Sequence, residues 1–339
     1  MVNIAKFPTY FDHNHSLNMK AAVRQQYGSP EQIQIKDMPK PILRPNEVLI
    51  KVMATTINRT DCGVLSGLPY IFRFFVGWPK PRNPILGTDF SGIVEEVGSK
   101  VTKFKLGDRV WGFEDEGLPS QAEYLAYGED KNILIIPEGL SFAEGAACAE
   151  GAHYALNFLK YVKLNPESKV LVNGATGGIG SAMVQFLKSQ GVHVTATANT
   201  KNMDLIQSLG PEQVIDYEKE DFTKIGETFD VIFDAVGKST FGKCKALLKE
   251  NGCYLSSELG EGIENLYLPL FTKIKGGKRV LFPLPSNIKG SMISIQKMVT
   301  EGKFRPVIEK SFPLEHAAEA YSYVASGKKT GNVVFDLAK

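Results

Sequence analysis

Cysteines, long apolar runs and excess charge are all scarce in this sequence. Its 339 residues include four cysteines, and no two of them form a CxxC pair. This spacing excludes zinc ribbons, iron–sulfur centres and disulfide-dense scaffolds, and it favours reduced thiols in a cytosolic protein. The formal net charge of +2 gives no basis for binding nucleic acid or an anionic membrane. No apolar run approaches the ~18 residues of a membrane span. We therefore expect neither kind of partner.

The amino terminus lacks a recognisable targeting signal. Residues 1–18 have no basic region followed by an apolar stretch and a cleavage site, and they contain no arginine, which a mitochondrial presequence would have. We interpret 1–18 as an extension and expect a cytoplasmic protein. The composition, 43% hydrophobic and 22% charged, is that of an ordinary globular protein. The length predicts about two domains.

The first part of the chain has the pattern of an antiparallel β domain. From residue 19 to 142, short β-type runs alternate with Gly, Pro and Asn, as at 47–52 and 92–97. Short strands at such spacing favour a barrel-like antiparallel domain. A last strand at 332–335 is expected to return to it, so we assign residues 19–142 and 303–339 to this domain.

Strands and helices alternate from 143 to 302. The run 169–173 has the pattern of a strand, and 178–190 carries apolar residues at helical spacing. Further strands are expected at 192–196, 213–216, 229–234 and 253–256. This alternation predicts an α/β domain with a parallel sheet and right-handed crossovers.

The most informative stretch runs from Val170 to Gly180, VLVNGATGGIG. It has the form strand, Gly-rich turn, helix, with the pattern AxGxxG, which is the context that a dinucleotide-binding loop requires. Gly177 lets a pyrophosphate approach the backbone, Gly180 allows close packing of helix on strand, and the helix N-terminus supplies N–H donors. The residues expected to contact the cofactor here are Thr176, Gly177, Gly178 and Ile179.

The end of the next strand indicates which dinucleotide binds. An NAD site usually places Asp or Glu there for the ribose 2′-hydroxyl. This sequence has Asn199, Thr200 and Lys201 instead, and no acid appears before Asp204. Neutral donors with one cation suit a 2′-phosphate. We therefore predict NADPH as the cofactor, with residues 199–201 among its contacts; a solvated loop lysine is the alternative.

Several motifs occur in an order typical of one enzyme family. They are NRTDCG at 58–63, GTDFSGIVEEVG at 87–98, GDRV at 107–110, the Gly-rich loop, FDAVG at 233–237 and KKTGNVVF at 328–335. Over residues 19–339 the chain resembles the medium-chain dehydrogenase/reductase superfamily, most strongly its zinc-free, quinone oxidoreductase-like branch, which includes zeta-crystallin-like enone and quinone reductases. The resemblance implies an α/β protein with a GroES-like β-barrel domain beside a Rossmann domain. It also implies an active site in the cleft between them. Members of the superfamily usually form dimers or tetramers, and we expect a homodimer.

The resemblance shows where zinc ligands are missing. Zinc-dependent members of the superfamily hold their catalytic metal with Cys, His and a second Cys. The corresponding positions here are Asn58, Thr88 and about Ala146. Amide, hydroxyl and methyl groups are poor zinc ligands, so no metal is expected.

The resemblance also implies site residues outside the Gly-rich loop. Asn58 is the expected catalytic residue, because its amide would bond the nicotinamide carboxamide or the substrate carbonyl; a turn-stabilising role is the alternative. The other implied cofactor contacts are Tyr217, Val236, Gly237, Gly331 and Asn332. Four titratable residues are left open as participants or structural groups, namely Asp61, Asp89, Glu150 and His153.

The expected substrate is a small carbonyl or quinone compound. Aromatic residues between 65 and 84 would line an apolar pocket for it, namely Tyr70, Phe72, Phe74, Phe75 and Trp78. The leading hypothesis is zinc-independent, NADPH-dependent reduction of quinones or α,β-unsaturated carbonyl compounds by hydride transfer. The alternatives are a zinc-type alcohol dehydrogenase with unrecognised ligands and a non-catalytic NADPH-binding protein.

Overall fold

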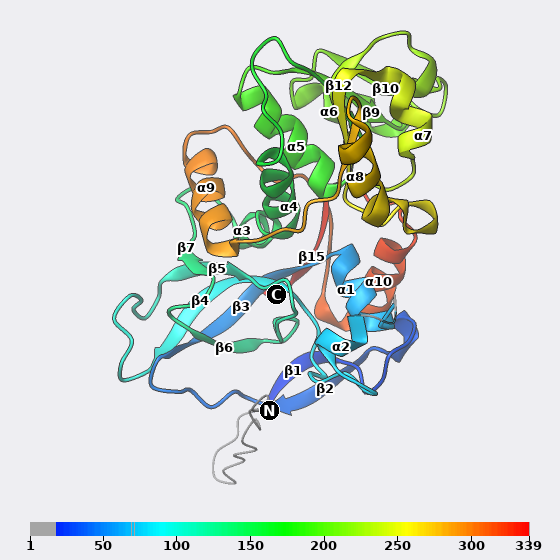
Figure 1. The fold of residues 1–339 in the computed structure, drawn as a ribbon. Coiled ribbons are helices and arrows are strands. Elements are labelled where there is room, and N and C mark those ends of the chain that lie inside the picture. Colours follow the sequence, from blue (N-terminus) through cyan, green and yellow to red (C-terminus); the bar gives the residue numbers. More distant parts are fainter. Residues whose placement is uncertain (1–17, 69, 71, 339) are drawn as a thin grey trace.

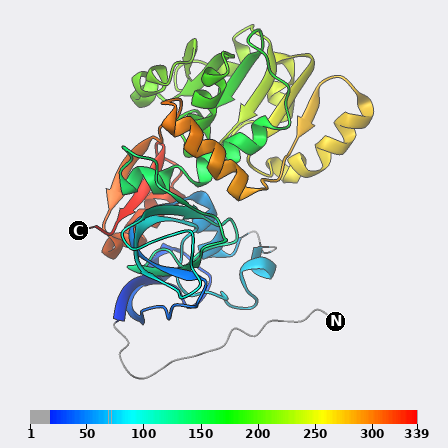
Figure 2. The ribbon, with the colours of Figure 1, turned by 90° about the vertical axis from the view of Figure 1, so that its left-hand side faces the viewer.

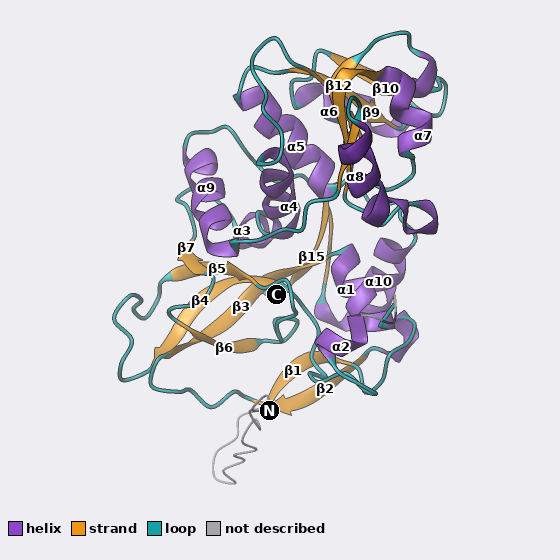
Figure 3. Ribbon diagram, in the orientation of Figure 1, coloured by secondary structure: helices purple, strands orange, loops and turns teal. Residues whose placement is uncertain are grey.

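The chain forms two bodies, drawn one above the other in Figure 1. The computed structural model describes residues 18–68, 70 and 72–338, without the side chains of Phe72 and Phe75. Apart from Asn18, the predicted extension therefore lies outside the described residues. Strands dominate the lower body, whereas strands and helices alternate in the upper one (Figure 3).

The lower body is built on a seven-stranded mixed sheet. Its order is β14–β15–β3–β4–β5–β7, and β6 also pairs with β3. The strands are β3 (Glu47–Ile57), β4 (Asp89–Val97), β5 (Arg109–Phe113), β6 (Tyr124–Gly128), β7 (Ile133–Ile135), β14 (Ile308–Phe312) and β15 (Asn332–Asp336). A separate antiparallel pair is formed by β1 (Asn18–Val23) and β2 (Gln34–Pro39).

The C-terminal strand β15 joins this sheet next to β3. Val333 lies opposite Ile57, and Phe335 lies opposite Thr55. Strand β3 thus extends beyond the run predicted at 47–52, because a segment far away in the sequence pairs with its end. The same extension carries the chain to Asn58, at the start of α1 (Arg59–Ser66).

The upper body contains a six-stranded parallel sheet in the order β10–β9–β8–β11–β12–β13. Its strands are β8 (Lys169–Asn173), β9 (His193–Ala198), β10 (Gln213–Asp216), β11 (Phe229–Asp234), β12 (Leu248–Ser256) and β13 (Arg279–Leu281). Numbered along the chain, the order is 3-2-1-4-5-6, which is that of a Rossmann sheet. The chain adds strands on one side of β8 as far as β10 and then on the other side from β11, so the switch point lies between β8 and β11. Ligands bind outside the carboxyl ends of the strands at such a point.

Helices cover both faces of the parallel sheet. Val170 and Val172 of β8 belong to one buried cluster and Leu171 belongs to another, because alternate residues of a strand point to opposite faces. The helices of this part are α4 (Glu150–Leu159), α5 (Gly178–Ser189), α6 (Met203–Ser208), α7 (Phe241–Cys244), α8 (Glu264–Lys275) and α9 (Ile288–Thr300). Before them in the chain comes α3 (Phe142–Ala147), which packs on the lower sheet. Figure 2 shows α9, in orange, along the side of the upper body that faces the lower one. None of the described helices is long and apolar enough to cross a membrane.

We propose residues 19–142 with 303–339 as one domain and residues 143–302 as the other. The sheet pairings support this division, because β14 and β15 join the sheet of β3 rather than the parallel sheet. At the junction, α3 packs against β3 and β15. The lower body also carries α2 (Phe72–Val76) and α10 (Ala317–Ala325), and α10 lies beside α1 (Figure 1).

Candidate active site

A cavity of about 1280 Å³ opens between the two bodies. It is lined from below by α1 and from above by the N-terminus of α4, the Gly-rich loop and residues that follow β10, β11 and β12. An ion pair between Arg59 and Glu258, at 3.6 Å, joins the two sides, and both residues line the cavity. The cavity therefore lies at the carboxyl ends of the parallel strands, where a dinucleotide is expected.

The Gly-rich loop turns tightly from β8 into α5. A Cβ atom on Gly180 would lie 2.1 Å from the carbonyl oxygen of Gly174, so only glycine fits there. Gly177 is the N-cap of α5, and no side chain caps this helix end. Since no acidic residue occupies the first turn either, its free N–H groups and partial positive charge suit a pyrophosphate.

The segment before β15 closes against this loop. The Gly331 N–H donates to the carbonyl oxygen of Thr176 at 2.6 Å, and Gly177 forms an isolated parallel bridge with Gly331. The Asn332 amide is held in turn by the carbonyl oxygen of Val307 at 2.9 Å. Residues close to the carboxyl terminus thus contact the proposed phosphate site.

The structure brings most of the sequence-predicted cofactor residues to the cavity. Those that line it are Thr176, Gly177, Gly178, Ile179, Tyr217, Val236 and Asn332. Gly331 contacts the Gly-rich loop as described, and the Gly237 N–H donates to the Asp234 carboxylate at 3.1 Å just beyond the lining.

Residues 199–201 make other contacts and are absent from the cavity lining. The Thr200 hydroxyl donates to Asp216 at 2.6 Å and its N–H donates to Glu218 at 3.0 Å. The Lys201 ammonium lies 3.7 Å from the Glu309 carboxylate. The basic residue that lines the cavity beside Tyr217 is Lys219, which sequence reasoning missed although it lies two positions further on.

The acceptor and donor roles of Asn58 follow from a buried network. The Thr56 hydroxyl donates to the Asp89 carboxylate, so its oxygen is left to accept from Asn58 Nδ2 at 2.7 Å. Nδ2 also lies 3.2 Å from Asp89 Oδ2. Both amide hydrogens are thereby engaged. Oδ1 closes the capping box of α1 with the Asp61 N–H, and its second lone pair can still accept a hydrogen bond from a ligand in the cavity that Asn58 lines.

Two buried carboxyls support this network. Asp89 also accepts the Thr56 N–H at 2.6 Å, and burial raises its pKa to about 6 against the effect of these donors. Asp61 accepts the Asn58 N–H at 2.8 Å, but its Oδ1 is buried and has no hydrogen-bond partner in the described part of the chain. Burial, with the nearby charge of Asp89, raises the pKa of Asp61 to about 8.

Glu150 begins α4 and lines the cavity, where it accepts a hydrogen bond from the Thr60 hydroxyl at 2.7 Å. Lys329, a second residue that sequence reasoning missed, lines the cavity as well and donates to the carbonyl oxygen of Gly331 at 2.8 Å. Burial lowers the pKa of this lysine. His153 is buried outside the cavity lining, against Phe113 and Asn157, and burial lowers its pKa to about 4.

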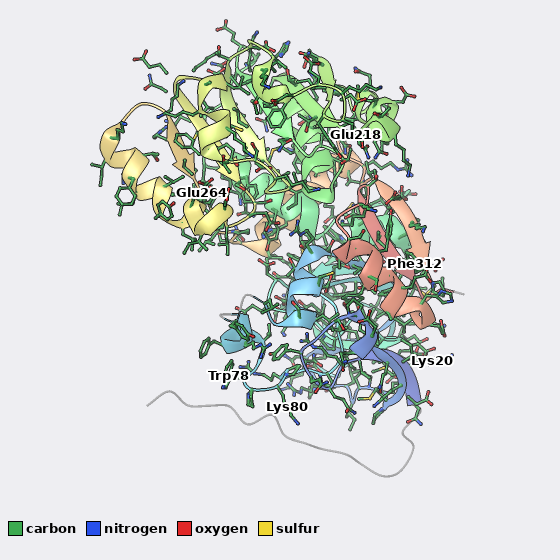
Figure 4. The ribbon with its side chains drawn as sticks, turned by 90° about the vertical axis from the view of Figure 1, so that its right-hand side faces the viewer. Lys20, Trp78, Lys80, Glu218, Glu264 and Phe312 are labelled. Atoms are coloured by element: carbon green, nitrogen blue, oxygen red, sulfur yellow. The ribbon has the colours of Figure 1, made fainter. Side chains whose placement is uncertain are left out.

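The predicted aromatic pocket differs from the lining found. Phe74 and Trp78 stack on each other with ring centroids 5.7 Å apart, and both are exposed. Figure 4 shows Trp78 on the outer side of the lower body. From the segment 65–84 the cavity takes aliphatic and small residues, namely Leu65, Ser66, Leu68 and Val76. The side chains of Phe72 and Phe75 lie outside the described residues.

The zinc-ligand positions carry no suitable donors. Thr88 is fully buried, with its hydroxyl 3.5 Å from Asp61, and Ala146 offers only a methyl group. In the part of the chain that the structure describes, no three His, Cys, Asp or Glu side chains are grouped to hold a metal ion. The residues present therefore do not fit a catalytic zinc.

The fold and the cavity together define a two-domain, dinucleotide-binding oxidoreductase. The family described as "Alcohol dehydrogenase GroES-like domain" matches residues 44–156, and the one described as "Zinc-binding dehydrogenase" matches residues 209–335. The first match runs from the strand-rich body into α4, and the second includes β14 and most of β15 of the strand-rich body. The matched ranges therefore cross the boundaries proposed above, which rest on the sheet pairings.

Similar proteins share nearly the whole chain. A 2-methylene-furan-3-one reductase of Solanum lycopersicum is 31% identical over 93% of this chain and 78% of its own. An NADPH-dependent alkenal/one oxidoreductase of Arabidopsis thaliana is 29% identical over 93% of this chain and 79% of its own length. The structure of the quinone oxidoreductase from Coxiella burnetii superposes with a TM-score of 0.82 and 31% sequence identity, over 95% of this chain and 100% of that one. The chain belongs to the medium-chain dehydrogenase/reductase superfamily, in its quinone oxidoreductase-like branch, and is an oxidoreductase that uses a nicotinamide cofactor. The fold class predicted from the sequence is confirmed.

Proposed function

We propose that the protein reduces quinones or α,β-unsaturated carbonyl compounds with NADPH, by hydride transfer and without zinc. The observation that carries this proposal is that the uncapped N-terminus of α5 and the Asn58 network line one cavity. A cofactor whose phosphates lie on the N-terminus of α5 would therefore present its hydride to a substrate beside Asn58. The similar proteins named above act on alkenals, enones and quinones, which supports the same substrate class here.

Each end of the cofactor has a matching set of residues. The pyrophosphate would lie on Gly177, Gly178 and Ile179, and the adenosine end would reach Tyr217 and Lys219. The bound cofactor supplies a hydride from its reduced nicotinamide ring. Asn58 Oδ1 is an acceptor, so it suits the NH₂ group of the nicotinamide carboxamide rather than the substrate carbonyl oxygen.

NADPH rather than NADH is proposed because a lysine lines the adenosine end of the cavity and no acidic residue stands where NAD sites usually have one. No acidic residue ends β9, and Lys219 lines the cavity beside Tyr217. A Lys219→Glu variant should raise KM for NADPH by about tenfold or more, since a charge-assisted hydrogen bond is worth ~1.5–3 kcal/mol. Lys201→Glu is the matched comparison. If Lys201→Glu raises KM for NADPH more than Lys219→Glu does, Lys201 rather than Lys219 contacts the 2′-phosphate.

The activity test measures NADPH oxidation with a panel of quinones and enones. Turnover with either class supports the proposal. Tight NADPH binding without turnover on any acceptor would instead indicate a non-catalytic binding protein. Dialysis against a chelator should leave kcat unchanged, because Asn58, Thr88 and Ala146 offer zinc no ligand set. Activity that is lost and then restored only by zinc would overturn that part of the proposal.

The homodimer and the cytoplasmic location stay predictions. A dimer through the edge of the parallel sheet would use β13, its last strand, and α8 beside it, which exposes Leu270 and Phe271. The molecular mass measured by light scattering distinguishes a dimer from a monomer.

A further inference from the structure

Glu150 is a buried acid with half of its hydrogen-bonding capacity unused. The side chain is 8% exposed and lines the cavity. Its Oε1 lies 2.7 Å from the Thr60 hydroxyl oxygen, whereas Oε2 is buried without a hydrogen-bond partner among the described residues. An ionised carboxylate with an unpaired buried oxygen is costly, so the neutral acid is favoured.

The charges around Glu150 act in the same direction. Burial raises the pKa of Glu150 well above its usual range, and the acids Asp61, Asp115 and Asp89 add to this rise wherever they are ionised. The Tyr154 phenol lies nearby and donates to Asp115 at 2.9 Å. The neighbouring cation is Lys329, whose own pKa is lowered by burial. The environment therefore favours the protonated form of Glu150 over the carboxylate.

The position of Glu150 joins the two domains at the reacting end of the cavity. The N-terminus of α4 packs tightly on the Gly-rich loop, since a Cβ on Gly151 would lie 2.7 Å from the carbonyl carbon of Gly178. Thr60 comes from α1 of the other body, two residues after Asn58, and is half-buried and cavity-lining. A proton held on Glu150 is thus one hydroxyl group away from the space beside Asn58.

We propose that Glu150 is the proton source for enone reduction and that the Thr60 hydroxyl delivers the proton. This inference rests on the proposed function. Hydride addition to the β-carbon of the enone moves the C=C electron pair toward the carbonyl and leaves an enolate. When the Thr60 hydroxyl rotates so that it accepts from Glu150 rather than donates to it, the Thr60 O–H proton can pass to the α-carbon of the enolate while the proton on Glu150 Oε1 passes to Thr60 Oγ1. The O–H bond of Glu150 breaks, a new bond to hydrogen forms on the substrate, and the carboxylate left faces Lys329 until water reprotonates it.

Quinones make a smaller demand on this pair. Hydride transfer to a quinone oxygen forms an O–H bond there and leaves the second oxygen as the phenolate-type anion of the aromatic hydroquinone, which takes a proton readily from solvent. Protonation of an enolate, by contrast, benefits from a positioned general acid, typically by about 10²–10⁴-fold. A variant that cannot deliver the proton should therefore lose activity with enones and keep activity with quinones, whereas a defect in hydride transfer should lower both.

Glu150→Gln tests this in the full-length protein, because glutamine keeps the shape of the side chain and cannot supply the proton. With cyclohexenone as acceptor, kcat should fall by about 100-fold or more, whereas kcat with benzoquinone and the Kd for NADPH should stay within about threefold. Wild-type kcat for cyclohexenone should also fall at alkaline pH as Glu150 loses its proton, and the variant should lack this limb. Glu138→Gln makes the same substitution at an exposed site outside the cavity and should change none of these quantities.

Glu150→Asp keeps the acid and should retain the alkaline limb at reduced kcat, which provides a second variant if glutamine is not tolerated. The inference is overturned if Glu150→Gln leaves cyclohexenone turnover unchanged, or if both acceptors lose activity by the same factor while NADPH still binds. Wild-type protein that oxidises NADPH with neither acceptor would overturn the proposed function itself.

Discussion

At the scale of single residues, two glycines of the same loop have separable roles. A Cβ at position 180 would meet backbone atoms of Gly174 and Ala175 at 2.1 and 2.8 Å, whereas a Cβ at 177 has no neighbour closer than 3.7 Å. Gly180→Ala should therefore lower the free energy of unfolding by ~1–3 kcal/mol through overpacking. Gly177→Ala should fold normally but place a methyl group where the pyrophosphate approaches, and should raise the Kd for NADPH by about tenfold or more.

Urea unfolding and NADPH titration of both glycine variants measure these effects. The opposite order, with Gly177→Ala unstable and Gly180→Ala stable, would contradict the assigned roles.

Asp61 should make stability depend on pH. Its pKa of about 8 in the folded chain lies far above the ~3.9 of an unfolded aspartate. Between these values the folded chain keeps a proton that the unfolded chain releases. The contribution to stability is thus fully present below the unfolded pKa and is lost as pH rises through about 8.

Asp61→Asn removes this titration and retains an oxygen for the Asn58 N–H. The free energy of unfolding of the variant, relative to wild type, should therefore rise between pH 5 and pH 8. A difference that is the same at both pH values would show that Asp61 is ionised in the folded protein.

At the scale of elements, the start of α3 depends on a capping box. The Ser141 hydroxyl accepts the Glu144 N–H at 3.2 Å, and the Glu144 carboxylate accepts the Ser141 N–H at 2.9 Å. Ser141→Ala should cost ~1 kcal/mol of folding free energy. Ser99→Ala, in an exposed turn after β4, is the control and should change stability little. Equal melting temperatures for the two variants would show that the cap is dispensable.

The sequence predicted helices and strands best where apolar residues recur at regular spacing. The predicted strands 169–173, 213–216 and 229–234 agree with β8, β10 and β11, and the predicted helix at 178–190 agrees with α5. The helix α8 was missed because Pro269 interrupts its pattern and much of its apolar surface is exposed. The end of β3 was missed because its partner β15 lies at the other end of the sequence.

At the scale of the whole molecule, cofactor binding should stabilise both domains together. The cavity is lined by residues of both bodies, so a ligand that binds only the folded state stabilises it by ~2.7 kcal/mol at a hundred times its Kd. NADPH should raise the melting temperature by several degrees, and NADH at the same concentration should raise it less. Equal increases in melting temperature with NADPH and NADH would contradict the proposed preference for a cofactor with a 2′-phosphate.

The sequence by itself determined the family, the Gly-rich loop and the absence of good ligands at the zinc positions. These features depend on short motifs and on residue chemistry, both of which can be read locally. Tertiary structure decided which polar groups meet at the cavity. It turned Thr200 toward Asp216, brought Lys219 and Lys329 into the lining, and placed Glu150 against Thr60. Burial and the proximity of like charges raise the pKa values of Asp61 and Glu150, and both effects arise only when distant segments pack together.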